Sequence, residues 1–170
     1  MILVNGIKSE FISILVVVLS FFGTICKDAF DYNFITSMFM HAGMGHFTGN
    51  MMVFLMLSPA VEKSYGKLNY IMALLFTGIV DYLFQTYVAH VMAIGLSGFV
   101  FALYMMNCFI PDNRNGISIC GIVLLFIYGS RELGGIMNND GISHSGHLLG
   151  LVTGLIYAIM YAQYKRIKAL

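Results

Sequence analysis

Six apolar segments follow one another along the chain, and this pattern constrains the fold more than any other feature. They cover residues 11–25, 45–61, 68–89, 96–110, 117–130 and 143–163. A helix needs about 20 mostly apolar residues to cross the ~30 Å hydrocarbon core of a membrane. We therefore predict an all-α, polytopic membrane protein in which six transmembrane helices form a compact bundle.

Composition supports a membrane protein and excludes other classes. Apolar residues make up 59% of the chain and charged residues only 10%, whereas a soluble globular chain carries about 25% charged residues. The net charge of +1 excludes a strongly basic nucleic-acid binder, so we expect no nucleic-acid partner. The three scattered cysteines form neither a disulfide framework nor a paired metal motif. With no internal repeat or low-complexity linker, residues 1–170 are predicted to form a single membrane domain.

The basic residues predict an orientation. The first segment is similar to the apolar core of a signal peptide, but no small-x-small cleavage site follows it, so we interpret it as a span. Six spans place both termini on one side, and a cytoplasmic assignment of that side puts seven of the nine Lys and Arg inside. The inner residues are Lys8, Lys63, Lys67, Arg114, Lys165, Arg166 and Lys168, and the outer residues are Lys27 and Arg131. The predicted location is a plasma membrane of bacterial type, with both termini cytoplasmic.

Polar residues within apolar segments are costly at membrane depth and often mark function. The first such cluster leads into the second segment, where His46 and Asn50 are four residues apart and share one helical face. Both side chains can donate hydrogen bonds to an anionic oxygen. The alternative is a pair of helix-bridging hydrogen bonds without chemistry. His41 lies further out, and we interpret it as structural rather than catalytic.

The second cluster is Gly95-Leu96-Ser97-Gly98. Glycines beside a serine leave room for a substrate backbone, and the unpaired N–H groups at a helix N-terminus can stabilise negative charge. Gly and Ser are also common packing residues in membrane helices, which is the alternative interpretation. The short fourth helix is expected to begin only after this motif, below the outer surface.

The third cluster lies at the start of the sixth segment. His147, Gly150 and Gly154 share one helical face, and Gly146, Gly150 and Gly154 form a surface on which another helix can pack closely. If the fourth helix is that neighbour, His147 comes close to Ser97.

A serine, an imidazole and a separate donor pair suit nucleophilic catalysis, because histidine is the commonest base for a serine hydroxyl. No Asp or Glu is placed in the sequence to orient the imidazole, so we predict a Ser–His dyad rather than a triad. Phe101 lies four residues after Ser97, and its ring is expected to pack on the imidazole. A metal site built from His41, His46, His144 and His147 is disfavoured, because neither cluster contains HExxH or a carboxylate. We expect no metal and no cofactor.

These residues resemble the motifs of the rhomboid intramembrane serine proteases. His41, His46 and Asn50 are similar to the family's H-x4-H-x3-N, and the stretch 95–98 is similar to its GxSG. The stretch 147–154 resembles the final HxxGxxxG, and Glu62 with Gly66 resembles an ExxxG.

The resemblance implies peptide-bond hydrolysis within or beside the bilayer, with Ser97 as nucleophile and His147 as general base. His46, Asn50 and the backbone amides of Ser97 and Leu96 would bind the oxyanion. Gly95, Gly98, Phe101, His41 and Gly150 would support the site. Substrates would be single-span membrane proteins whose helix unwinds near its outer end.

The sequence also departs from the family pattern. It contains no Trp, so the Trp-Arg pair common in the family's first outer loop is missing, and Phe101 stands where many relatives have Tyr. Asp81 and Gln85 have two possible roles, as interfacial residues, which we favour, or as cavity lining. A catalytically silent relative that binds membrane clients is the alternative function, although the presence of both Ser97 and His147 argues against it. A small transporter or channel is disfavoured by the lack of paired halves.

Overall fold

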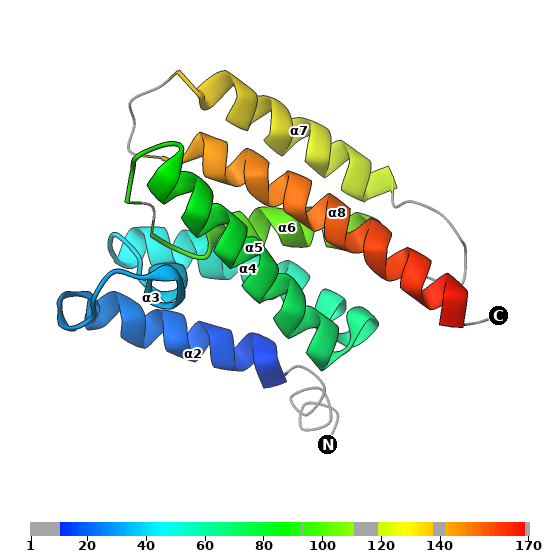
Figure 1. The fold of residues 1–170 in the computed structure, drawn as a ribbon, viewed down its shortest axis with the longest axis horizontal. Helices are drawn as coiled ribbons and strands as arrows, with labels where there is room; N and C mark the ends of the chain where they lie inside the picture. The colour runs from blue at the N-terminus through cyan, green and yellow to red at the C-terminus, as the bar shows by residue number, and fades with distance from the viewer. Residues whose placement is uncertain (1–10, 93, 111–118, 138–141, 169–170) are drawn as a thin grey trace.

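The protein is all-α in the part of the chain that the computed structural model describes, which is residues 11–92, 94–110, 119–137 and 142–168. These residues form seven α-helices and one 3-10 helix (Figure 1). In chain order they are α2 (Phe11–Ile25), η1 (Lys27–Ala29), α3 (Phe34–Phe39), α4 (Met44–Tyr65), α5 (Lys67–Tyr87), α6 (Ser97–Cys108), α7 (Ile119–Gly135) and α8 (His144–Lys168).

The six longer helices lie where the six apolar segments predict helices. The extra helix, α3, begins with a capping box: the Asn33 side chain accepts from the Ile35 and Thr36 N–H groups, and the Thr36 hydroxyl accepts from the Asn33 N–H. Lys8 and Arg114, which support the predicted orientation, lie outside the described residues.

The helix of the second apolar segment is longer than the segment itself, because α4 continues through Pro59 and past residue 61 to Tyr65. Buried Ser58 and Glu62 hydrogen-bond neighbouring helices on either side of the proline, and this packing keeps the last turns helical. The Glu62 carboxylate accepts the N–H groups of Ile12 and Ser13 at 3.0 and 2.7 Å. It therefore caps the start of α2, whose first N–H groups have no partner inside the helix.

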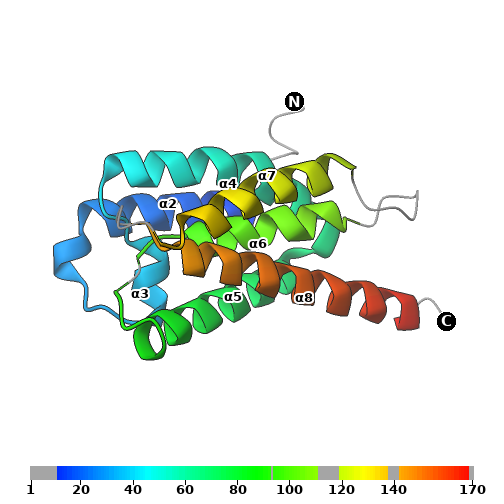
Figure 2. The same cartoon turned by 90° about the horizontal axis from the view of Figure 1, so that it is seen from above.

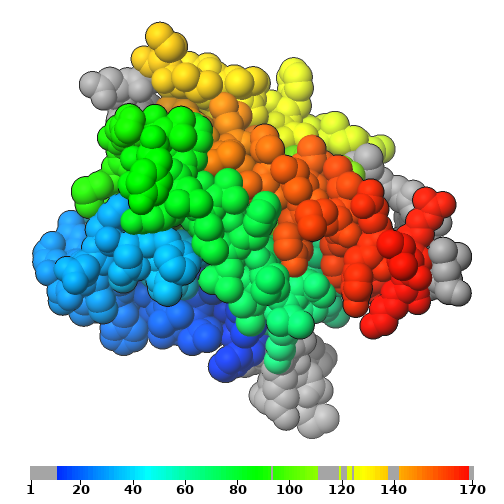
Figure 3. Space-filling view, in the orientation of Figure 1, coloured from blue at the N-terminus to red at the C-terminus, as the bar shows by residue number. Residues whose placement is uncertain are grey.

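The short helix α6 is the centre of the bundle. All of its residues except Ser97 and Asn107 are buried, and α4, α5, α7 and α8 pack around it (Figure 2). On the face shown in Figure 3, α5 and α8 cover it.

Glycines allow α6 and α8 to touch backbone to backbone. A Cβ on Gly150 would collide with the Gly98 carbonyl, and one on Gly154 would collide with the backbone of Ala102. This is the close approach predicted from the glycine spacing in the sixth segment. This contact between the two helices fixes the position of His147 along α8 relative to the start of α6.

Apolar side chains are exposed on the outside of the bundle, including Met56, Phe126 and Ile159. Among the described residues, α5 and α8 are long and apolar enough to cross a membrane, and α2 and α6 are shorter apolar helices.

Candidate active site

The loop before α6 presents Ser97 at the first position of that helix. Gly95 has φ +118°, a conformation that favours glycine, and its N–H donates to the Ser37 carbonyl of α3 at 2.8 Å. A Cβ at Gly95 would come within 3.0 Å of the His46 ring. The glycine therefore brings the serine loop against α3 and the start of α4.

His41 is fully buried and holds the same loop. Its Nε2 accepts a long hydrogen bond, 3.5 Å, from the Leu96 N–H, and its Nδ1 lies 3.2 Å from both the Phe39 carbonyl and the Thr24 hydroxyl. These partners require a neutral ring with the proton on Nδ1. His41 lies between α3 and α4, and burial, followed by the nearby His46, lowers its pKa to about 4, so the ring stays neutral at pH 7.

The predicted role of the Leu96 amide as an oxyanion donor therefore has to be corrected. Its N–H points to the buried His41 ring, so it is not free to bind an oxyanion. The N–H groups of the first turn of α6, beginning with Ser97, have no partner within the helix and remain candidate donors.

His147 in α8 lies beside the first turns of α6. Its ring stacks on Phe101 with centroids 4.3 Å apart and planes inclined by 12°. Because Gly98 touches Gly150, Ser97 and His147 lie at the same level of the contact between the two helices. In the part of the chain described, the two side chains do not hydrogen-bond each other, and catalytic hydrogen bonds are often long before substrate binds.

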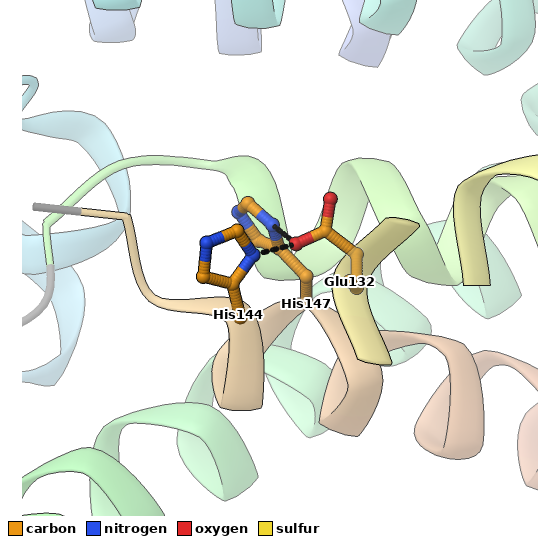
Figure 4. A group of neighbouring side chains, drawn as sticks. All are labelled: Glu132, His144 and His147. Carbon is orange, nitrogen blue, oxygen red and sulfur yellow. Dashed lines mark hydrogen bonds and ion pairs between the residues drawn. The ribbon is translucent and has the colours of Figure 1, made fainter. Parts of the chain in front are cut away.

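A carboxylate orients His147, and the prediction that no Asp or Glu does so is wrong. Glu132 extends from α7, and its Oε2 lies 2.8 Å from Nδ1 of His147 and 2.6 Å from Nδ1 of His144 (Figure 4). An ionised carboxylate can only accept, so a hydrogen bond to ionised Glu132 requires each imidazole to carry its proton on Nδ1. The Nε2 of His147 is then left as the basic nitrogen.

The same three side chains form a group that could hold a metal ion. The ligand atoms of Glu132, His144 and His147 lie within 4.8 Å of one another, so the histidines at the start of α8 do have a carboxylate beside them, contrary to the prediction. The group differs from the disfavoured set of four histidines. The Nδ1 atoms of the two imidazoles hydrogen-bond the same carboxylate oxygen. These hydrogen bonds explain why the three side chains lie together without an ion.

The predicted donor pair lies at the start of α4. His46 is exposed, and its Nδ1 accepts from the Ala42 N–H at 3.4 Å. The side-chain nitrogen of Asn50 is buried and has no hydrogen-bond partner among the described residues. A buried donor without a partner is costly, and such a group is suited to a ligand oxygen.

Asp81 and Gln85 of α5 line a cavity, so the preference for an interfacial role is wrong. The cavity measures ≈ 20 Å³, about the size of one water, and is bounded by Gly95 and Leu96 on the side of the serine loop. Gln85 donates to the Ser143 hydroxyl at 2.6 Å and to Asp81 at 3.2 Å. Ser143 also accepts from the Gly146 N–H, so Gln85 fixes the start of α8.

Glu132 is the site residue that sequence reasoning missed. The fifth apolar segment was expected to end at Ser130, but α7 continues to Gly135. With the helix extended, Tyr128, Glu132 and Gly135 fall on one face, and all three contact the α6–α8 pair. Helical spacing from Tyr128 was the signal that could have found it.

The comparisons with known proteins agree with the motifs. The family model described as "Rhomboid domain" matches residues 31–164. The chain belongs to the rhomboid family. Rhomboids are membrane proteins, so this chain is an integral membrane protein built as a helical bundle.

The curated relatives are distant. A protein provisionally named rhomboid protein L523, from Acanthamoeba polyphaga mimivirus, is 27% identical over 76% of this chain and 74% of its own length. One provisionally named rhomboid protease YdcA, from Bacillus subtilis (strain 168), is 26% identical over 79% of this chain and 69% of its own length. Rhomboid-related protein 1 of Caenorhabditis elegans is 24% identical over 76% of this chain and 40% of its own length.

Proposed function

We propose that this rhomboid is an intramembrane serine endopeptidase with Ser97 as nucleophile and His147 as general base. The observation that carries the proposal is the geometry of His147. Phe101 and Glu132 fix the plane and the Nδ1 edge of its ring beside the helix start that carries Ser97. A ring held in this way presents Nε2 as the base.

The proposed reaction follows from these positions. Ser97 Oγ attacks the scissile carbonyl while His147 Nε2 takes its proton, and the imidazolium then gives that proton to the leaving amine. Asn50 Nδ2, His46 and the Ser97 backbone N–H would stabilise the oxyanion. Water then hydrolyses the acyl-enzyme by the same proton transfers in reverse order.

The proposed setting is a bilayer crossed by six helices with both termini cytoplasmic. The polar groups of the site lie at the starts of α4, α6 and α8 and at the end of α7, which are the helix ends assigned to the outer side by the basic residues. Substrates would be single-span membrane proteins. Their helix must unwind near its outer end before attack, because helical hydrogen bonds shield the peptide bond.

The test uses protein purified in detergent, a fluorophosphonate probe and a single-span substrate with small or helix-breaking residues near its outer end. We expect labelling and cleavage that disappear in Ser97→Ala and in His147→Ala and that resist chelators. Cleavage by Ser97→Ala would overturn the proposal. Loss of activity on adding a chelator would instead favour a metal at Glu132, His144 and His147.

A silent, client-binding rhomboid is the second candidate. It predicts that wild-type protein binds a single-span client but neither cleaves it nor reacts with the probe. Retention of both Ser97 and His147 argues for the protease.

A further inference from the structure

The carboxylate of Glu132 is buried, with its side chain 3% exposed. A charge taken out of water is costly unless it is paired and hydrogen-bonded. Here two imidazole N–H groups from α8 meet one carboxylate oxygen, and each is nearly as sheltered as the carboxylate, with side chains 6% and 13% exposed.

We propose that Glu132 is a positioning residue that holds His147 in the Nδ1–H tautomer and stabilises the imidazolium formed when Ser97 gives up its proton. This inference rests on the proposed protease function. It makes the site a Ser–His–Glu arrangement instead of a dyad. His144 in turn positions Glu132, because its Nδ1–H binds the same carboxylate oxygen that His147 contacts.

Three contacts restrict the His147 ring. Phe101 covers one face, Glu132 binds the Nδ1 edge, and the close contact between Gly98 and Gly150 fixes the backbone. In the step proposed, the proton moves from Ser97 Oγ to His147 Nε2, and the Nδ1 proton stays on the ring. The carboxylate oxygen of Glu132 faces this positive charge at 2.8 Å, where shelter from water strengthens the attraction.

Charged or titratable side chains on α4, α5, α7 and α8 lie near His147. Glu132 comes from α7 and His144 from α8 itself, and His46 of α4 is near enough to act on it electrostatically. From α5, Asp81 lies against Gly98 and Gly146. Loss of the Glu132 charge should therefore make the imidazolium harder to form, so the acid limb of the activity profile should move to lower pH.

The experiment compares Glu132→Gln and Glu132→Ala with wild type, with Arg131→Gln as the control. Arg131 is the exposed neighbour on α7, so the control removes a charge from the same helical turn without touching the site. We expect kcat/KM for the single-span substrate to fall between about 10²- and 10⁴-fold in Glu132→Ala, since loss of a correctly oriented tautomer costs up to ~10⁴-fold in serine proteases. Glu132→Gln should fall less and show the shifted acid limb, and Arg131→Gln should match wild type.

If Glu132 only stabilised the fold, replacing it would lower thermal stability. The pH dependence of activity of the protein that remains folded would then be unchanged. Wild-type activity together with an unshifted profile in Glu132→Gln therefore overturns the inference and leaves the protease proposal intact. Failure of wild type to label or cleave overturns the protease proposal instead.

A second measurement needs no substrate. The ¹⁵N shifts of His147 in labelled wild-type protein, assigned by comparison with His147→Ala, should show the Nδ1–H tautomer. An Nε2–H tautomer overturns the inference whatever the enzymatic result.

Discussion

Phe101 and His147 stack nearly parallel, with ring centroids 4.3 Å apart, and this contact joins the helix that begins with Ser97 to the helix that carries the imidazole. Phe101 lies one helical turn after Ser97. The relative position of hydroxyl and base is therefore set by an aromatic contact within the bundle core and not by a flexible loop.

We expect Phe101→Tyr to keep kcat/KM near the wild-type value, because the ring and its stacking are retained. Phe101→Leu should lower kcat/KM about tenfold, since loss of the flat support lets the imidazole shift, and misplacement of reacting groups is costly. Thermal midpoints measured beside the rates separate this effect from unfolding. Equal rates for wild type and Phe101→Leu would show that Glu132 alone orients the base.

Asn50→Ala is expected to lower kcat by ~10²-fold or less, the scale of one oxyanion donor, without loss of stability. The reason is that its side-chain nitrogen is buried with no partner among the described residues, so the folded protein loses no hydrogen bond from it. The measurements are turnover of the single-span substrate and the free energy of unfolding in micelles. Wild-type turnover in the variant would remove Asn50 from the proposed oxyanion site.

The sequence predicted helix positions well because long apolar runs leave few alternatives. The end of α2 matches the prediction, and α8 begins within one residue of it. Helix ends were less predictable: Pro59 is tolerated inside α4 because contacts with neighbouring helices hold the turns that follow it.

The side-chain partners depended on tertiary packing that spacing alone does not reveal. The Leu96 amide was expected in the oxyanion site, but a buried histidine 55 residues away accepts its N–H. Glu132 lay beyond the predicted end of its segment, so the helical spacing from Tyr128 was not extended to it. By contrast, the contact between Gly150 and α6 followed directly from glycine spacing, because only one face of α8 lacks side chains.

That glycine face gives a stability prediction. Gly150→Ala should lower the free energy of unfolding by about 1–3 kcal/mol, the usual cost of overpacking, because the added Cβ would collide with the Gly98 carbonyl. Gly134→Ala on α7 is the matched control, since nothing lies within 4 Å of its Cβ position. Reversible unfolding in detergent micelles measures both. Equal stability of Gly150→Ala and wild type would show that α8 can move away from α6.

His41 gives a pH dependence of stability. Burial first, and the neighbouring His46 second, lower the pKa of His41 to about 4, whereas a histidine in the unfolded chain has a pKa of about 6.5. Between these values the unfolded chain binds more protons than the folded one, so stability is complete above pH 6.5 and falls as the pH drops toward 4. The loss from this residue should approach about 3 kcal/mol at low pH.

Carboxylates titrate in the same range, so the comparison is made against His41→Asn, which removes this titration and keeps a polar side chain. The variant should be less stable than wild type at pH 7, because the support of the Leu96 amide is weakened, but its stability should decline less between pH 6.5 and 4. Unfolding free energies in micelles at half-unit pH steps give both curves. Parallel curves would mean that His41 is accessible to protons in the folded protein, and the neutral ring that holds the serine loop would have to be abandoned.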